Sequence, residues 1–110
     1  MLEEPDRDRG QGRNGMSVNA DSMMWGAKFL KAMPKGLPEP EVEFDPDGET
    51  VVEWWSLGHG TFSISFSASG VMQYAGLFGV VDHPHGNVKF DGKTIPAEIL
   101  DYIRRAGTDV

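Results

Sequence analysis

The sequence predicts one small α+β domain, in which a four-stranded antiparallel meander carries an N-terminal and a C-terminal helix on one face. Three observations predict this fold. Apolar residues recur at helical spacing after residue 19 and again after residue 95, and between them two segments alternate apolar and polar residues around a turn that ends in glycine. Two helices that flank a meander bury the most apolar surface when both cover the same sheet face.

The first 16 residues are polar, charged and rich in glycine, so they hold too little apolar surface to offset the entropy lost on ordering. We therefore expect residues 1–16 to form a flexible arm and residues 17–107 to form the domain. Ser17 or Asn19 is expected to cap a first helix over residues 19–32, which Pro34 ends. The apolar stripe of this helix is expected to comprise Ala20, Met23, Ala27 and Leu30, widened by Met24, Phe29 and Met33.

Residues 39–55 are expected to form a β-hairpin. Val42 and Phe44 alternate with glutamates, and Asp45-Pro46-Asp47-Gly48 is typical of a type I turn whose glycine takes positive φ. A three-residue loop then pairs Asp45 with Glu49. Counting back from this turn places Phe44 opposite Thr50, Val42 opposite Val52, and Glu41 opposite Glu53.

A second hairpin is expected around Ser67-Ala68-Ser69-Gly70, with Phe66 beside Met72 and Ile64 beside Tyr74. We expect residues 82–87 to form a loop, and a last helix to begin at Pro96 and to end at Gly107. The buried stripe of that helix is expected to comprise Ile95, Ile99, Leu100 and Ile103.

The composition excludes several classes of site. Seventeen Asp and Glu side chains against ten Lys and Arg give a net charge of −7, which disfavours direct binding to nucleic-acid phosphates. The chain has no cysteine, so disulfides, thiolate metal sites and cysteine nucleophiles are excluded. The acidic N-terminus lacks the apolar run of a secretory signal, and no stretch approaches the ~20 apolar residues of a membrane helix. We expect a cytoplasmic protein that does not bind membranes.

The acidic hairpin is the candidate site. The expected pairing places its carboxylates and Trp55 on the sheet face opposite Val42 and Phe44, with neighbouring carboxylates of one strand ~6.6–6.8 Å apart. That spacing is comparable with the spacing of successive phosphates in a nucleic-acid strand. The partner-binding residues are expected to be Glu41, Glu43, Asp45, Glu49, Glu53 and Trp55.

The resulting hypothesis is a non-enzymatic interaction protein without a cofactor, whose acidic face binds a basic protein surface such as that of a nuclease or a CRISPR effector complex. Its most specific form is a nucleic-acid mimic of the anti-restriction or anti-CRISPR type. Two alternatives stay open. The charges can serve only to solvate an outer sheet face and to protect its edge strand from aggregation. An antitoxin-like or housekeeping module would instead bind one cognate protein through an apolar surface around Trp55.

Other chemistry has weaker support in the sequence. Asp82-His83-Pro84-His85 contains metal-ligand residue types, but no third ligand is evident beyond Asp82 and the distant His59. Paired carboxylates on a convex hairpin offer no cleft for hydrolysis. A strand-to-helix nucleophile elbow is also lacking, because alternating strand and turn positions hold Ser63, Ser65, Ser67 and Ser69. We therefore expect neither a metal site nor an enzyme.

The run Leu37-Pro38-Glu39-Pro40-Glu41-Val42, with Pro46-Asp47-Gly48 and Glu53-Trp54, resembles a family of small proteins found in bacterial genomes and on mobile elements. Tyr74-Ala75 and Phe90-Asp91-Gly92-Lys93-Thr94-Ile95-Pro96 are similar to a strand end and a helix start in that family, so the resemblance covers about residues 10–106. The chain departs from the family's N-terminal Gly-Trp-Asp-Gly motif, because Gly12-Arg13-Asn14-Gly15 lacks the tryptophan and the aspartate. The resemblance implies the fold and assigns no activity.

Overall fold

The computed structural model describes residues 18–107 and shows an α+β fold, as the sequence predicts. The expected arm at residues 1–16 and the departing motif at residues 12–15 lie outside the described residues. The elements follow one another as α1 (Ala20–Ala32), β1 (Glu41–Phe44), β2 (Thr50–Ser56), β3 (Gly60–Phe66), β4 (Val71–Leu77), β5 (His85–Lys89) and α2 (Ala97–Gly107).

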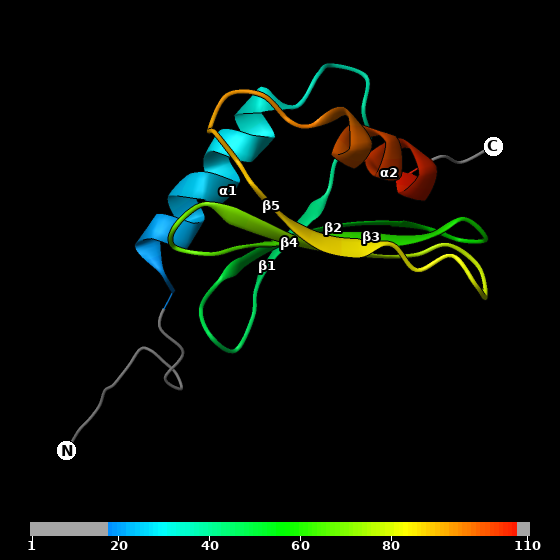
Figure 1. The fold of residues 1–110 in the computed structure, drawn as a ribbon, viewed down its shortest axis with the longest axis horizontal. Helices are drawn as coiled ribbons and strands as arrows, with labels where there is room; N and C mark the ends of the chain where they lie inside the picture. Colours follow the sequence, from blue (N-terminus) through cyan, green and yellow to red (C-terminus); the bar gives the residue numbers. More distant parts are fainter. Residues whose placement is uncertain (1–17, 108–110) are drawn as a thin grey trace.

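The sheet has five strands in sequence order, all antiparallel, and both helices lie on the same side of it (Figure 1). The prediction of four strands is therefore wrong, because part of the expected loop at residues 82–87 belongs to β5. This strand lacks the alternating apolar pattern of the others, since its residues on the helix side are only Gly86 and Val88. Gly86 is required by packing: a Cβ atom there would lie 2.8 Å from the hydroxyl oxygen of Tyr74.

Both predicted hairpin registers are confirmed. Glu41 pairs with Glu53 and Val42 with Val52, and in the second hairpin Phe66 pairs with Met72. The first turn closes as its chemistry predicts: the amide of Asp45 donates to the carbonyl of Glu49 at 2.9 Å, and Gly48 has φ of 82°. A turn that fixes the loop length also fixes which side chains share a face.

The core lies between the sheet and the helices. Phe29 of α1 is fully buried, and its ring centroid lies 5.4 Å from that of Phe66, 5.8 Å from that of Phe90 and 6.2 Å from that of Trp54. The linker between α1 and β1 is tied to this core, because the indole N–H of Trp54 donates to the carbonyl of Pro38 at 2.9 Å. Other fully or almost fully buried core side chains are Val52, Phe62, Ile64, Met72, Ile99 and Ile103.

Helix α1 begins after Asn19, whose side chain accepts a hydrogen bond from the amide of Ser22 at 2.9 Å, as one of the two predicted caps. Its predicted apolar stripe is right in part: Phe29 is buried and Met33 half-buried, but Met23, Met24 and Leu30 are exposed. The other buried residues of the helix are Ser22 and Gly26. Two small residues let the helix axis approach the sheet. A Cβ atom at Gly26 would lie 2.9 Å from Cγ2 of Thr50.

Helix α2 has the predicted buried stripe. Ile95, Ile99 and Ile103 are buried and Leu100 is half-buried. Its C-terminal end is held to the sheet because the hydroxyl of Ser56 donates to the carbonyl of Ala106 at 2.7 Å. Neither helix of residues 18–107 is long and apolar enough to cross a membrane.

Candidate functional site

The outer face of the sheet, opposite the helices, carries an uneven distribution of charge. One row across the five strands comprises Glu41, Glu53, Ser63, Ala75 and His85, and the next comprises Glu43, Val51, Ser65, Gln73 and Asn87. The carboxylates lie at the β1–β2 end of these rows, and small or neutral side chains follow. The candidate site is thus the acidic end of the sheet face that lies opposite the helices.

Glu41, Glu43 and Glu53 form the centre of this site, and we call them the acidic triplet. Each offers a carboxylate oxygen that lies within 4.8 Å of the other two. The pairing explains the proximity, because Glu41 is directly opposite Glu53 and Glu43 is the next outward residue of β1. No ion pair within residues 18–107 involves these carboxylates, so their charge is not neutralised by the described part of the chain.

The environment of the triplet raises the pKa of Glu53 above its ordinary value of 4.5. The largest cause is burial of the carboxyl group, followed by the charge of Glu43, a hydrogen bond to the Glu43 carboxyl and the charge of Glu41. The neighbouring negative charges thus oppose ionisation of Glu53 in the folded protein.

Replacing Glu53 with glutamine is expected to raise the melting temperature at pH 7, because a like-charge pair directly opposite on two strands costs about 0.2–1 kcal/mol. Folding raises the pKa of Glu53, so the stability linked to its proton is fully present below the unfolded pKa and is lost as pH rises through the folded pKa. The gain should therefore shrink towards zero as pH falls to about 4. Thermal unfolding followed by circular dichroism at pH 4 and pH 7 measures the change in melting temperature of Glu53→Gln relative to the wild type. Glu39→Gln is the control, and a gain of equal size at both pH values would contradict the expectation.

Asp45 and Glu49 lie apart from the triplet, at the turn of the hairpin. The Asp45 carboxylate accepts hydrogen bonds from the amides of Asp47 at 2.9 Å and of Glu49 at 3.0 Å, so this side chain holds its own turn together. Burial, and then the charges of Asp45 and Asp47, raise the pKa of Glu49. Asp45 is thus placed as a structural residue of the turn.

Trp55 joins the triplet in one surface. Its side chain is 56% exposed, and it lies two residues along β2 from Glu53 on the same outer face. Glu41, Glu53 and Trp55 line one hollow of about 320 Å³ together with Pro38, Glu39, Ser56 and Gly107. The hollow therefore combines carboxylate oxygens with an accessible indole.

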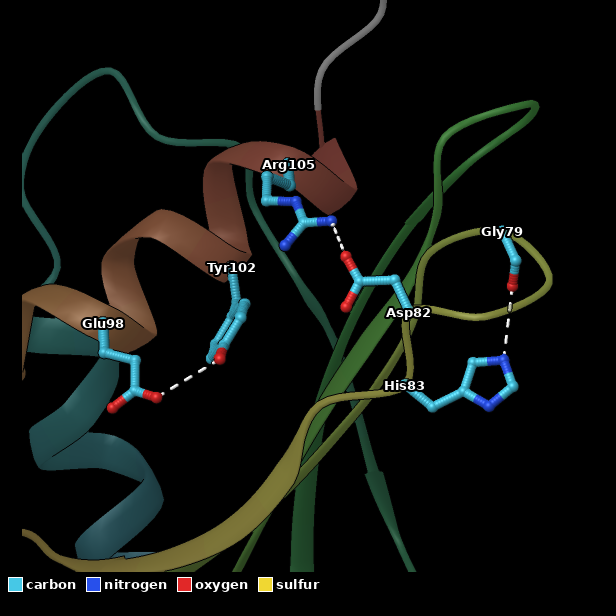
Figure 2. Close-up of polar contacts among 6 residues, drawn as sticks. All are labelled: Gly79, Asp82, His83, Glu98, Tyr102 and Arg105. Carbon is cyan, nitrogen blue, oxygen red and sulfur yellow. Dashed lines mark hydrogen bonds and ion pairs between the residues drawn. The ribbon is translucent and has the colours of Figure 1, made fainter.

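The histidine loop does not gather a metal-ligand set within residues 18–107. The ring of His83 contacts the carbonyl of Gly79 at 3.3 Å, and Asp82 forms an ion pair with Arg105 of α2 (Figure 2). The ring of His85 contacts the carbonyl of His83 at 3.2 Å. Among the described residues, only the acidic triplet brings three metal-ligand side chains together. Three carboxylates at this spacing can hold either a hard cation or a cationic side chain.

The structure shows two apolar surfaces, of which the sequence interpretation names only the one around Trp55. That surface lies at the end of the sheet, where the exposed side chains are Leu57, Leu77, Val80 and Val81. The surface that the sequence interpretation missed is a hollow of about 480 Å³ between α1 and β1, lined in part by Leu30, Met33, Leu37 and Val42. The apolar loop residues Val80 and Val81 are a sequence signal that could have extended the surface around Trp55.

Comparison of the chain with protein-family models, with curated proteins and with solved structures gives no match.

Proposed function

We propose that this protein is a non-enzymatic interaction module that presents the acidic triplet and Trp55 to a basic protein partner. The observation that carries the proposal is the meeting of the three triplet carboxylates, which form no ion pair within residues 18–107, beside a hollow that Glu41 and Glu53 line together with the exposed Trp55. Solubility alone does not account for the crowding of like charges on paired strands, because that arrangement opposes folding.

The chemistry of the hollow suits an arginine or lysine side chain of the partner. Charge-assisted hydrogen bonds from a guanidinium or ammonium group are about twice as strong as neutral ones. The indole of Trp55 offers a face on which a guanidinium group can stack. Exposed tryptophan side chains are also enriched among the residues that contribute most to protein interfaces. Burial and then the charges of Glu43 and Glu41 raise the pKa of Glu53, and a cation at the triplet would offset those charges.

The more specific form of the proposal is a partner that binds nucleic acid, with the hairpin occupying its basic groove as an inhibitor of the anti-restriction or anti-CRISPR type. Support comes from the crowding of negative charge on the outer face of the hairpin, as along a nucleic-acid strand. The two-residue rise of the β1 backbone, ~6.6–6.8 Å, is comparable with the spacing of successive phosphates, although oxygens of the triplet approach one another within 4.8 Å. Such a partner would bind this protein and nucleic acid competitively, and both interactions would weaken steeply with salt.

Neutralising the triplet is expected to weaken binding of a fluorescent nona-arginine peptide about tenfold or more. The reason is that one charge-assisted hydrogen bond contributes about 1.5–3 kcal/mol, and 1.4 kcal/mol is a factor of ten in affinity. Fluorescence anisotropy at fixed salt compares the wild type with the variant carrying Glu41→Gln, Glu43→Gln and Glu53→Gln.

The matched control carries Asp21→Asn, Asp47→Asn and Asp101→Asn, which removes three negative charges elsewhere on the exposed surface. It should bind the peptide within about twofold of the wild type, since exposed charges distant from a contact are screened by salt. Equal weakening of both variants would mean that the peptide responds only to net charge, and the proposal would fail.

A second candidate function rests on the apolar end of the sheet. Trp55 lies in the same cross-strand row as Leu77, and Leu57, Val80 and Val81 are exposed in the adjacent loops. An antitoxin-like or housekeeping module would bind its cognate protein through this surface. For that function, Trp55→Ala would abolish binding to the cognate protein and the triplet substitutions would leave it unchanged.

A further inference from the structure

The helix-facing side of β1 is not covered by either helix. Val42 pairs with Val52 and Phe44 with Thr50, and both of these β2 residues are buried. Val42 and Phe44 themselves are 48% and 40% exposed, because α1 packs over β2 and β3. The edge of the sheet therefore ends in two apolar side chains that point to the core side and that no helix of residues 18–107 covers.

One flank of α1 extends this apolar strip. Trp25 faces the β4–β5 side, where its indole donates to the carbonyl of Ala68 at 3.2 Å and its ring meets Phe90 edge-on at 6.2 Å. At 100° per residue, the exposed Met23 and Leu30 lie on the opposite flank of the helix, which is the β1 side. We call this apolar strip, formed by Val42 and Phe44 of β1 and Met23 and Leu30 of α1, the β1 groove. It includes the hollow of about 480 Å³ that Leu30 and Val42 line together.

The backbone of β1 has one open edge. The amide of Asp45 points to β2, since it donates to the carbonyl of Glu49. Residues of an antiparallel strand alternate in the neighbour to which they bond, so Val42 and Phe44 direct their N–H and C=O groups away from β2. β1 is the first strand in the order, and these groups have no neighbouring strand within residues 18–107. Pro40, which has no N–H, limits pairing on that side to a short segment.

The charges along β1 select what can pair with it. A strand added to the edge would place alternate side chains on the two faces of the sheet. Side chains on the core side would lie over Val42 and Phe44 in the groove, and those on the outer side would lie beside Glu41 and Glu43 of the acidic triplet. Apolar residues suit the first set and arginine or lysine the second.

We propose that β1 is a docking edge, which a partner completes with an extended segment of alternating apolar and basic residues, paired antiparallel to Val42 and Phe44. The inference rests on the proposed function and specifies how the basic partner engages the acidic triplet. Backbone hydrogen bonds to β1 would align the incoming strand. Its apolar side chains would contact the β1 groove, and its basic side chains would contact the acidic triplet.

A labelled peptide of four Arg-Val repeats tests the proposal on the full chain. It is expected to bind saturably and to slow hydrogen exchange at the amides of Val42 and Phe44, which should exchange fast in the free protein because no strand of residues 18–107 pairs with them. Opposite residues share a face, so the valines lie opposite Val42 and Phe44 and exchange hydrogen bonds with them. N-methylation of the valine nitrogens should weaken binding at least tenfold, whereas N-methylation of the arginine nitrogens should leave it within about twofold.

Equal binding of the unmethylated peptide and both methylated peptides would overturn strand pairing. Loss with the arginine set alone would support pairing in the parallel orientation instead. The Val42→Thr and Phe44→Thr double variant places polar residues of high strand propensity on the edge and should bind the Arg-Val peptide several-fold more weakly. It should bind nona-arginine as the wild type does. The edge proposal can therefore fail while the acidic-triplet proposal stands, and the two outcomes are distinguishable.

Two other occupants of the edge would also overturn the proposal. Slow exchange at Val42 and Phe44 in the free monomer would assign the groove to residues 1–17 of the same chain. A dimer in analytical ultracentrifugation that the double variant abolishes would assign it to a second copy.

Discussion

Replacing Phe29 with alanine is expected to lower the free energy of unfolding by about 3–5 kcal/mol, which is typical of a buried phenylalanine truncated to alanine. The ring is fully buried and meets Trp54, Phe66 and Phe90 at centroid distances of 5.4–6.2 Å. The loss combines the transfer energy of the ring with the cavity that three large aromatic neighbours cannot close. Urea unfolding followed by circular dichroism measures the difference.

Leu30→Ala is the matched control for this substitution. Leu30 is the next residue of α1, and it is 37% exposed in the β1 groove. Its truncation should cost less than about 1 kcal/mol, because substitutions away from the packed core are usually small in effect. Equal costs at the two positions would mean that α1 is rotated relative to the structure, with the apolar stripe of the sequence facing the sheet.

Replacing Ser22 with alanine is expected to cost about 2–6 kcal/mol, because it leaves two buried backbone groups unpaired at about 1–3 kcal/mol each. The Ser22 hydroxyl accepts from the amide of Thr50 at 2.7 Å and donates to the carbonyl of Phe66 at 2.6 Å. The register of β2 and β3 would place Thr50 opposite Phe66. The Ser22 hydroxyl therefore takes the place of the backbone hydrogen bond that would otherwise join these two residues. A side chain of α1 thus ends the pairing of two central strands. Urea unfolding of Ser22→Ala against the wild type measures the cost.

Thr50→Val separates the effect of a bonded hydroxyl from that of an unbonded one. The hydroxyl of Thr50 is buried and has no hydrogen-bond partner within residues 18–107. Its removal with shape retained should be neutral or stabilising. If Thr50→Val destabilises the protein as much as Ser22→Ala does, the cost at Ser22 comes from disturbed packing and the hydrogen-bond explanation is wrong.

The hairpins could be predicted from the sequence because their turn residues determine loop length. Asp45-Pro46-Asp47-Gly48 leaves one register for the strands that follow, and that register places Glu41 opposite Glu53. The role of the Asp45 side chain in this turn was not predicted from the sequence, which placed Asp45 among the partner-binding residues. Its carboxylate bonds within the turn, a local use that alternation of strand faces does not reveal.

The buried face of α1 could not be predicted from apolar periodicity. Close approach to the sheet favours the small Ser22 and Gly26, which contribute little to a hydrophobic pattern. The more apolar Met23 and Leu30 are left on the β1 flank, where they form part of a groove. Strand β5 could not be predicted for a similar reason. Gly86 lies opposite Tyr74 on the helix side and leaves space for its ring, so the strand lacks the alternation of apolar and polar residues.

The order of the strands has a consequence for the entropy of folding. Each strand pairs with its neighbour in sequence, and the connecting segments within the sheet are seven residues or fewer. Each strand pairing therefore closes only a short loop, so each step of sheet assembly loses little conformational entropy. The contacts that close long loops are those between the helices and the sheet, since Ser22 is 44 residues from Phe66 and Ser56 is 50 residues from Ala106. The Ser22 hydroxyl can bridge Thr50 and Phe66 only where β2 and β3 already lie side by side. This long-range contact of α1 thus depends on the local contacts of the sheet.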